Sequence, residues 1–159
     1  AEVMNALPDI EQRTDKADIG CGTGLLAKAW RRGDMVGYDV SIGQVEIARA
    51  SGRYARVSEL DINEHPLPKK YDLITACDLF NLTLATADCL PNVASSLKEG
   101  GLLIMTMPQH TGYHDEAGWP FQTSFELIDE TEEFQSWIGE NSGTPKYHKI
   151  QTWRKVNEQ

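Results

Sequence analysis

The chain has 159 residues, of which 40% are hydrophobic and 25% charged, a balance that predicts one globular domain over residues 1–159. Its formal net charge of −9 makes nucleic acid an unlikely partner, because most of such a surface repels a polyanion. We find no run of about 18 apolar residues and no signal-peptide pattern, so we expect no membrane association.

The cysteines are three in number, Cys21, Cys77 and Cys89, and they lack the close pairing of a zinc site. They fit a reduced compartment better than a disulfide framework. We therefore expect a cytoplasmic protein with no metal site. No pattern in the sequence indicates a particular oligomeric state.

The first predicted elements surround a glycine-rich loop. Residues 1–7 favour a short amphipathic helix, residues 17–19 a short and weak strand, and residues 25–30 a helix. The loop carries glycines at alternating positions, 20, 22 and 24, which allow a tight turn and a close approach to a ligand. At a strand-to-helix junction, such a loop also points backbone N–H groups outward at the positive end of the helix.

Strands and helices then alternate along the chain. A helix is predicted between Ser41 and Gly52, and Ser41 with Gln44 forms a capping-box pattern. This alternation predicts a parallel, doubly wound α/β sheet with right-handed crossovers. The remaining predicted elements are strands at 35–39, 54–60, 71–77 and 102–107, and a helix at 87–98 that ends at Gly100-Gly101.

The C-terminal third gives a weaker pattern. Residues 125–134 fit either an antiparallel strand or one face of a helix, and residues 150–156 alternate as a terminal strand would. Residues 109–123 contain two glycines and a proline, which disfavour a long helix. We interpret that segment as a loop over a ligand site or as a remnant of a helix.

The spacing of the loop glycines separates two kinds of nucleotide fold. Asp18-x-Gly20-x-Gly22-x-Gly24 differs from the G-x-G-x-x-G fingerprint of dinucleotide-binding folds. It resembles the D-x-G-x-G-x-G signature of class I S-adenosylmethionine-dependent methyltransferases, although glycines that only form a turn are the alternative. The resemblance extends over residues 17–108. It implies a Rossmann-like three-layer α/β/α sandwich with a mostly parallel seven-stranded sheet, whose last strand is antiparallel.

The resemblance implies that S-adenosylmethionine is bound around the loop. Gly20 and Gly22 leave room for the methionine and ribose parts, and Asp18 fixes polar groups around them. Cys21 and Gly24 belong to the same set of cofactor-binding residues. Asp39, at the end of the second predicted strand, can accept hydrogen bonds from both ribose hydroxyls, with Val40 beside it. An Asp that only begins a turn is the alternative for position 39.

Two further pairs follow the third and fourth predicted strands. In the family that the chain resembles, an acid at the position of Asp61 faces the adenine amine while its neighbour, here Ile62, packs on the ring. A solvated loop acid is an equal alternative. Cys77 and Asp78 correspond to the place where the methionine part and the methyl acceptor meet. The sequence there is not the Asn-Pro-Pro-Tyr type of enzymes that methylate nucleic-acid amines.

The acceptor side has weaker signals. His110 and His114 follow the fifth predicted strand, and either could act as a general base on a hydroxyl, although ordinary surface histidines are the more common case. We expect in-line attack of a small-molecule acceptor on the sulfonium methyl group. A protein side chain as acceptor, or a non-catalytic protein that binds the cofactor, are the alternatives.

Overall fold

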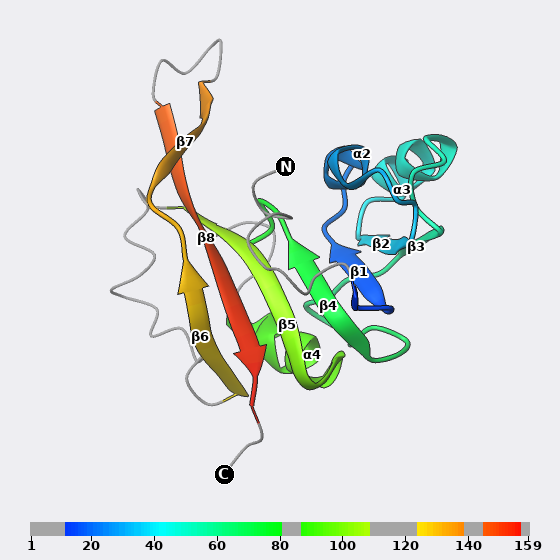
Figure 1. The fold of residues 1–159 in the computed structure, drawn as a ribbon. Coiled ribbons are helices and arrows are strands. Elements are labelled where there is room, and N and C mark those ends of the chain that lie inside the picture. The colour runs from blue at the N-terminus through cyan, green and yellow to red at the C-terminus, as the bar shows by residue number, and fades with distance from the viewer. Residues whose placement is uncertain (1–11, 81–86, 109–123, 139–144, 157–159) are drawn as a thin grey trace.

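The computed structural model describes residues 12–80, 87–108, 124–138 and 145–156 (Figure 1). Its strands are β1 (Lys16–Ile19), β2 (Met35–Asp39), β3 (Arg56–Glu59), β4 (Tyr71–Ala76), β5 (Leu97–Pro108), β6 (Phe125–Glu130), β7 (Phe134–Ile138) and β8 (Pro145–Lys155). Its helices are α2 (Leu25–Trp30), α3 (Ile42–Ala50) and α4 (Leu90–Ser95), with a 3₁₀ turn η2 (Ala87–Cys89) before α4. The helix predicted at residues 1–7 lies outside the described residues.

The strands form one sheet in the order β3-β2-β1-β4-β5-β8-β6, with β7 also paired to β8. Strands β1 to β5 are parallel to one another, and β8 is antiparallel to β5. Figure 1 shows β6 and β7 following one another along the outer side of β8. The predicted Rossmann-like fold is therefore confirmed, with two successive strands at the edge where one was expected.

The pairing with β8 explains why residues 125–134 are extended. β8 runs for 11 residues and offers a long edge to β6 and β7. Between these two strands, the backbone N–H of Thr131 donates to the carbonyl of Ile150 at 3.0 Å. A helical spacing of apolar residues is a local signal, and here the hydrogen bonds of the sheet outweigh it.

Helices cover the two faces of the sheet, and each face has its own buried cluster. Leu102 and Ile104 of β5 belong to one cluster, which includes residues of α2 and α3. Leu103 and Met105 belong to the other, which includes residues of α4. Alternate residues of one strand thus contact opposite helix layers, as the α/β/α sandwich requires.

One local prediction was wrong, and another was confirmed only in part. The helix predicted to reach residue 98 ends at Ser95, because the carbonyl of Ser96 accepts a 2.8 Å bond from the N–H of Tyr71 and Leu97 already pairs with β4. Ser41 is the N-cap residue of α3, but its side chain makes no capping hydrogen bond. Among the described residues, no helix is both long and apolar enough to cross a bilayer.

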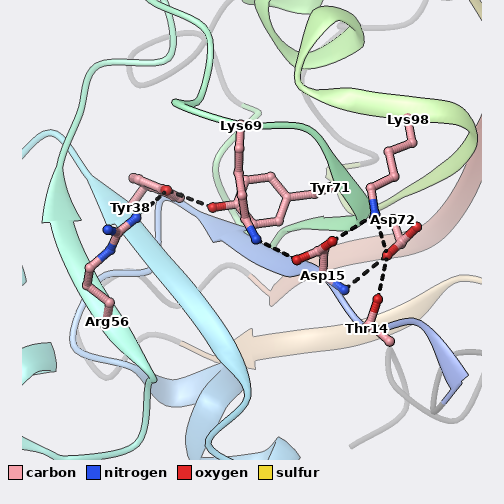
Figure 2. Close-up of polar contacts among 8 residues, drawn as sticks. All are labelled: Thr14, Asp15, Tyr38, Arg56, Lys69, Tyr71, Asp72 and Lys98. Carbon is pink, nitrogen blue, oxygen red and sulfur yellow. Dashed lines mark hydrogen bonds and ion pairs between the residues drawn. The ribbon is translucent and has the colours of Figure 1, made fainter.

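A cluster of charged side chains ties the starts of three strands together (Figure 2). Lys98 Nζ lies 2.7 Å from Asp15 Oδ2 and 3.1 Å from Asp72 Oδ2, and Lys69 also binds Asp15. Hydrogen bonds from Lys69 and then Lys98 lower the pKa of Asp15 to about 2. The cluster precedes β1 and β4 and begins β5, so it fixes the amino-terminal edge of the sheet.

Candidate functional site

A cleft of about 510 Å³ opens at the carboxyl ends of β1 to β4. In open α/β sheets this edge is where ligands bind. From the segments after β1 and β2, the predicted residues that line it are Gly20, Gly22, Asp39 and Val40. From the segments after β3 and β4, they are Asp61, Ile62, Cys77 and Asp78. Four distant parts of the chain thus meet around one space.

The glycine loop forms one wall of the cleft. Gly20 has a φ of 64°, and a Cβ placed on it would lie 2.7 Å from Cδ1 of Leu79. Gly22 has a φ of 51°, with no side chain of its own toward the cleft. The N–H of Cys21 donates to the carbonyl of Tyr38 at 3.0 Å, which attaches the loop to β2. The loop is therefore a fixed backbone surface that a ligand can approach closely.

Asp39 is held by two backbone donors. The N–H of Gly22 donates to Oδ2 at 2.8 Å, and the N–H of Ser41 donates to Oδ1 at 2.9 Å. A carboxylate has about four lone-pair sites, so each oxygen keeps an acceptor position. Asp39 can therefore accept further hydrogen bonds from a ligand that carries two neighbouring hydroxyls.

Asp18 lies beneath the loop and does not line the cleft, which differs from the expected direct contact with a ligand. Its side chain is 2% exposed and accepts hydrogen bonds from Tyr54 at 2.6 Å and Thr75 at 2.8 Å. Burial raises the pKa of Asp18 to about 6, against the effect of these hydrogen bonds. Strand alternation explains the placement: Ala17 and Ile19 belong to the α4-side cluster, whereas Tyr54 belongs to the opposite one.

Cys21 and Gly24 also support the loop from behind and do not line the cleft. The thiol of Cys21 faces β2, since a Cβ on Gly37 would lie 3.0 Å from its Sγ. Burial raises the pKa of Cys21 to about 12, so it is a neutral thiol at physiological pH. A Cβ on Gly24 would lie 3.1 Å from the ring of Tyr54. Both residues therefore act through packing.

Beyond Asp39, the end of the cleft near β2 and β3 combines a second carboxylate with apolar side chains. Asp61 Oδ1 accepts hydrogen bonds from the backbone and side-chain nitrogens of Asn63, at 2.9 and 3.1 Å. Ile62 is buried next to it, and Val40 is 57% exposed at the cleft. Leu60 also lines this part. A flat, largely apolar ring with a polar edge matches these surroundings.

At the other end, Asp78 connects three strands. Its N–H donates to Oγ1 of Thr106 on β5 at 2.7 Å, and its Oδ1 lies 3.6 Å from Nε2 of His148 on β8. Cys77, beside it, has its pKa raised to about 12 by burial and stays protonated. The ionisable groups at this end are therefore the carboxylate of Asp78 and the imidazole of His148, and Cys77 is not a reactive thiolate.

Several residues at or next to this site were not predicted from the sequence. Tyr38 and Leu79 line the cleft next to predicted residues, and their position in the chain could have indicated them. His148 was missed because the terminal strand was predicted from residue 150, whereas β8 starts at Pro145. Gln44 also lines the cleft, although it was read as a capping residue.

The two histidines proposed as general bases, His110 and His114, lie outside the described residues. Within the part of the chain that the structure describes, no three His, Cys, Asp or Glu side chains are grouped as a metal site requires.

Comparisons with known proteins agree with this geometry. A family model described as "Methyltransferase domain" matches residues 17–105, more than half of the chain. A malonyl-acyl-carrier protein O-methyltransferase of Acetivibrio thermocellus is 30% identical over 132 residues, covering 79% of this chain and 46% of that protein. A trans-aconitate 2-methyltransferase of Afipia carboxidovorans is 29% identical over 113 residues, covering 69% and 44%. The chain therefore spans less than half the length of these two relatives.

Solved structures share the fold at low sequence identity. The structure of StiE O-MT superposes with a TM-score of 0.76 at 17% identity, over 98% of this chain and 72% of that one. An S-adenosylmethionine-dependent methyltransferase from Mesorhizobium loti gives a TM-score of 0.68 at 16% identity, over 96% and 95%.

Proposed function

This chain belongs to the methyltransferase domain family, in its class I S-adenosylmethionine-dependent form, and we propose that it transfers a methyl group from S-adenosylmethionine to a small molecule. The observation that carries the proposal is the carboxylate of Asp39, bound by the N–H of Gly22 at the edge of the cleft. This bond joins the family signature to the carboxylate that can accept from a ribose.

The residues of the cleft fit the cofactor. Asp39 would accept hydrogen bonds from the ribose hydroxyls, and Val40 and Ile62 would contact the adenine ring. Gly20 and Gly22 would allow the methionine part to lie against the backbone, because neither presents a side chain there.

The charge of the cleft also supports a sulfonium ligand. Among the described residues that line it, three are carboxylates, Asp39, Asp61 and Asp78, and none is lysine or arginine. A cationic ligand gains favourable electrostatic interactions in such surroundings.

The protein's own contribution is mainly positional. When bound, S-adenosylmethionine supplies an already activated methyl group on its sulfonium. The loop and Asp39 would hold the nucleoside, and the β4 end of the cleft would align the acceptor and exclude water. Holding two reactants in line replaces a bimolecular encounter, which is a large part of the rate gain available to such an enzyme.

A small-molecule acceptor is supported by the name of one of the two relatives and by the acidic chain. One relative is named for trans-aconitate, a small acid, and the other for malonyl-acyl-carrier protein. The net charge of −9 disfavours nucleic acid as acceptor.

Calorimetry with S-adenosylmethionine and S-adenosylhomocysteine tests cofactor binding directly. We expect binding by the intact chain and a loss of about 10-fold or more for Asp39→Ala. Asp129→Ala, which removes an exposed acid on β6, is the control. Methyl transfer from labelled cofactor into a metabolite extract then separates an enzyme from a protein that only binds. The proposal would be contradicted if the intact chain bound neither S-adenosylmethionine nor S-adenosylhomocysteine and Asp39→Ala gave the same result.

A further inference from the structure

We infer that the methyl acceptor is an uncharged hydroxyl compound, that the Asp78 carboxylate takes its proton, and that His148 positions this carboxylate. The inference rests on the proposed methyl transfer and names the acceptor class of the same site.

The order of the strand ends gives the cleft a direction. Asp61 follows β3, Asp39 ends β2, the glycine loop follows β1 and Asp78 follows β4, and these strands are neighbours in that order. With the nucleoside at the β2 and β3 end, the methyl-bearing part points toward β4. The acceptor must then come from the side of β4 and β5, where Asp78 lies.

Asp78 has an unusual backbone for its position. Its φ is 56°, and among the described residues other than glycine only Arg31, which caps the end of α2, shares a positive φ. A positive φ costs most side chains about 1–2 kcal/mol and Asp less, and such conformations are concentrated at functional sites. The bond from its N–H to Thr106 holds the conformation. The strain presents a carboxylate that is 76% exposed and lines the cleft.

His148 approaches the same carboxylate from a distant part of the chain. It is opposite Pro108 in the pairing of β8 with β5, and its side chain is only 8% exposed. Its Nε2 lies 3.6 Å from Oδ1 of Asp78, so the imidazole limits the orientations that the carboxylate can take. His148 is thus a positioning residue, and Asp78 is the group that can touch the acceptor.

The distribution of lysine and arginine argues against a carboxylate acceptor. Lys98 is the only such residue between positions 71 and 145 of the sequence, and it binds Asp15 and Asp72 at the opposite edge of the sheet. The described lining of the cleft holds three carboxylates and no permanent cation. A carboxylate brought there would meet like charges without a partner, which is costly. A hydroxyl meets no such penalty, and it needs the base that Asp78 provides.

The step balances without a further reactant. The acceptor oxygen forms a bond to the methyl carbon, the carbon–sulfur bond breaks, and its electron pair stays on sulfur. The hydroxyl proton passes to the Asp78 carboxylate and from there to solvent. The products are a methyl ether, S-adenosylhomocysteine and one proton.

The chemistry of the product tests the acceptor class. The full chain is incubated with methyl-labelled S-adenosylmethionine and a small-molecule extract of bacterial cells, and the labelled products are treated with alkali. Methyl ethers survive this treatment, and we expect the label to be retained in uncharged products. Label released as volatile methanol would indicate a methyl ester, and label retained on a cation exchanger would indicate a methylated amine. Either result overturns the inference.

The labelling experiment and calorimetry on the same preparation separate the two proposals. Transfer of the label to an ester or an amine overturns the inference on the acceptor and leaves the proposed methyl transfer intact. Binding of S-adenosylmethionine without any transfer overturns both proposals and leaves only cofactor binding. Absence of binding overturns the proposed function itself.

Variants test the roles of the two residues. With the acceptor that becomes labelled in this experiment, we expect Asp78→Asn to lower kcat about 100-fold and His148→Gln to lower it about 10-fold. The kcat of the double variant should be no lower than that of Asp78→Asn alone. The affinity of His148→Gln for S-adenosylmethionine, measured without acceptor, should change less than about 3-fold, because His148 does not line the cleft. Asp129→Asn and His65→Gln, both at exposed side chains, are the matched controls. The positioning role of His148 would be overturned if the two substitutions lowered kcat additively. It would also be overturned if His148→Gln changed only KM.

Discussion

The backbone nitrogen of Gly22 lies 2.8 Å from Oδ2 of Asp39, so the loop after β1 and the end of β2 are joined by a charge-assisted hydrogen bond. Together with the bond from Ser41, it fixes the orientation of the carboxylate. A group that is already oriented loses little conformational entropy when a ligand binds.

Asp39→Asn tests how much this orientation matters. An amide keeps one acceptor oxygen but places a donor where the N–H of Gly22 or Ser41 now donates. We expect the affinity for S-adenosylmethionine to fall about 10- to 100-fold by calorimetry, because one loop contact and one ribose acceptor are lost together. Asp129→Asn should leave the affinity unchanged. If Asp39→Asn left the affinity for S-adenosylmethionine unaltered, the negative charge of Asp39 would not be needed for binding.

Gly20→Ala tests the need for a bare backbone in the loop. Alanine at a φ of 64° is strained by about 1–2 kcal/mol, and its Cβ would also press on Leu79. Gly52 has nearly the same φ of 65° but nothing within 4 Å of a Cβ, so Gly52→Ala measures the strain alone. We expect urea unfolding to show a larger loss of stability for Gly20→Ala than for Gly52→Ala. Equal losses would mean that Leu79 moves aside without cost.

The cleft was predictable from the sequence because its polar residues follow strands. In a parallel sheet, the residues after each strand meet at one edge, so Asp39, Asp61 and Asp78 could be placed together without coordinates. The fold followed from the same alternation of strands and helices.

The parts that were missed depend on contacts between distant residues. Nothing local indicates that Asp18 points away from the cleft, since this depends on which helix layer its strand face contacts. His148 reaches Asp78 only because β8 returns beside β5. The extended structure of β6 is likewise decided by its partner strand and not by its own spacing of apolar residues.

Because Asp18 is buried, we predict that its ionisation makes the free energy of unfolding depend on pH. Burial raises its pKa to about 6 from an ordinary 3.8. A raised folded-state pKa contributes stability that is complete below about 3.8 and is lost as the pH rises through about 6. Asp18→Asn carries no such charge, so its free energy of unfolding relative to wild type should increase between pH 4 and pH 7, by up to about 3 kcal/mol. Urea unfolding at several pH values measures this difference.

The asparagine amide also changes the hydrogen bonds with Tyr54 and Thr75, which alters the free energy of unfolding by an amount that does not depend on pH. This constant amount does not affect how the difference from wild type changes with pH. Asp129→Asn, at an exposed site, should differ from wild type by a constant amount. If the difference between Asp18→Asn and wild type were also constant between pH 4 and pH 7, the ionisation of Asp18 would not be coupled to folding.

The cluster around Asp15 predicts a pH dependence of the opposite sign. Lys69 and Lys98 lower the pKa of Asp15 to about 2, so its contribution to stability is present above about 3.8 and is lost as the pH falls toward 2. Asp15→Asn removes this titration, and its free energy of unfolding should fall less steeply than that of wild type between pH 4 and pH 2. Thermal unfolding followed by circular dichroism measures both slopes, with Asp129→Asn as control. Parallel slopes would mean that the two lysines do not hold the carboxylate of Asp15 in solution.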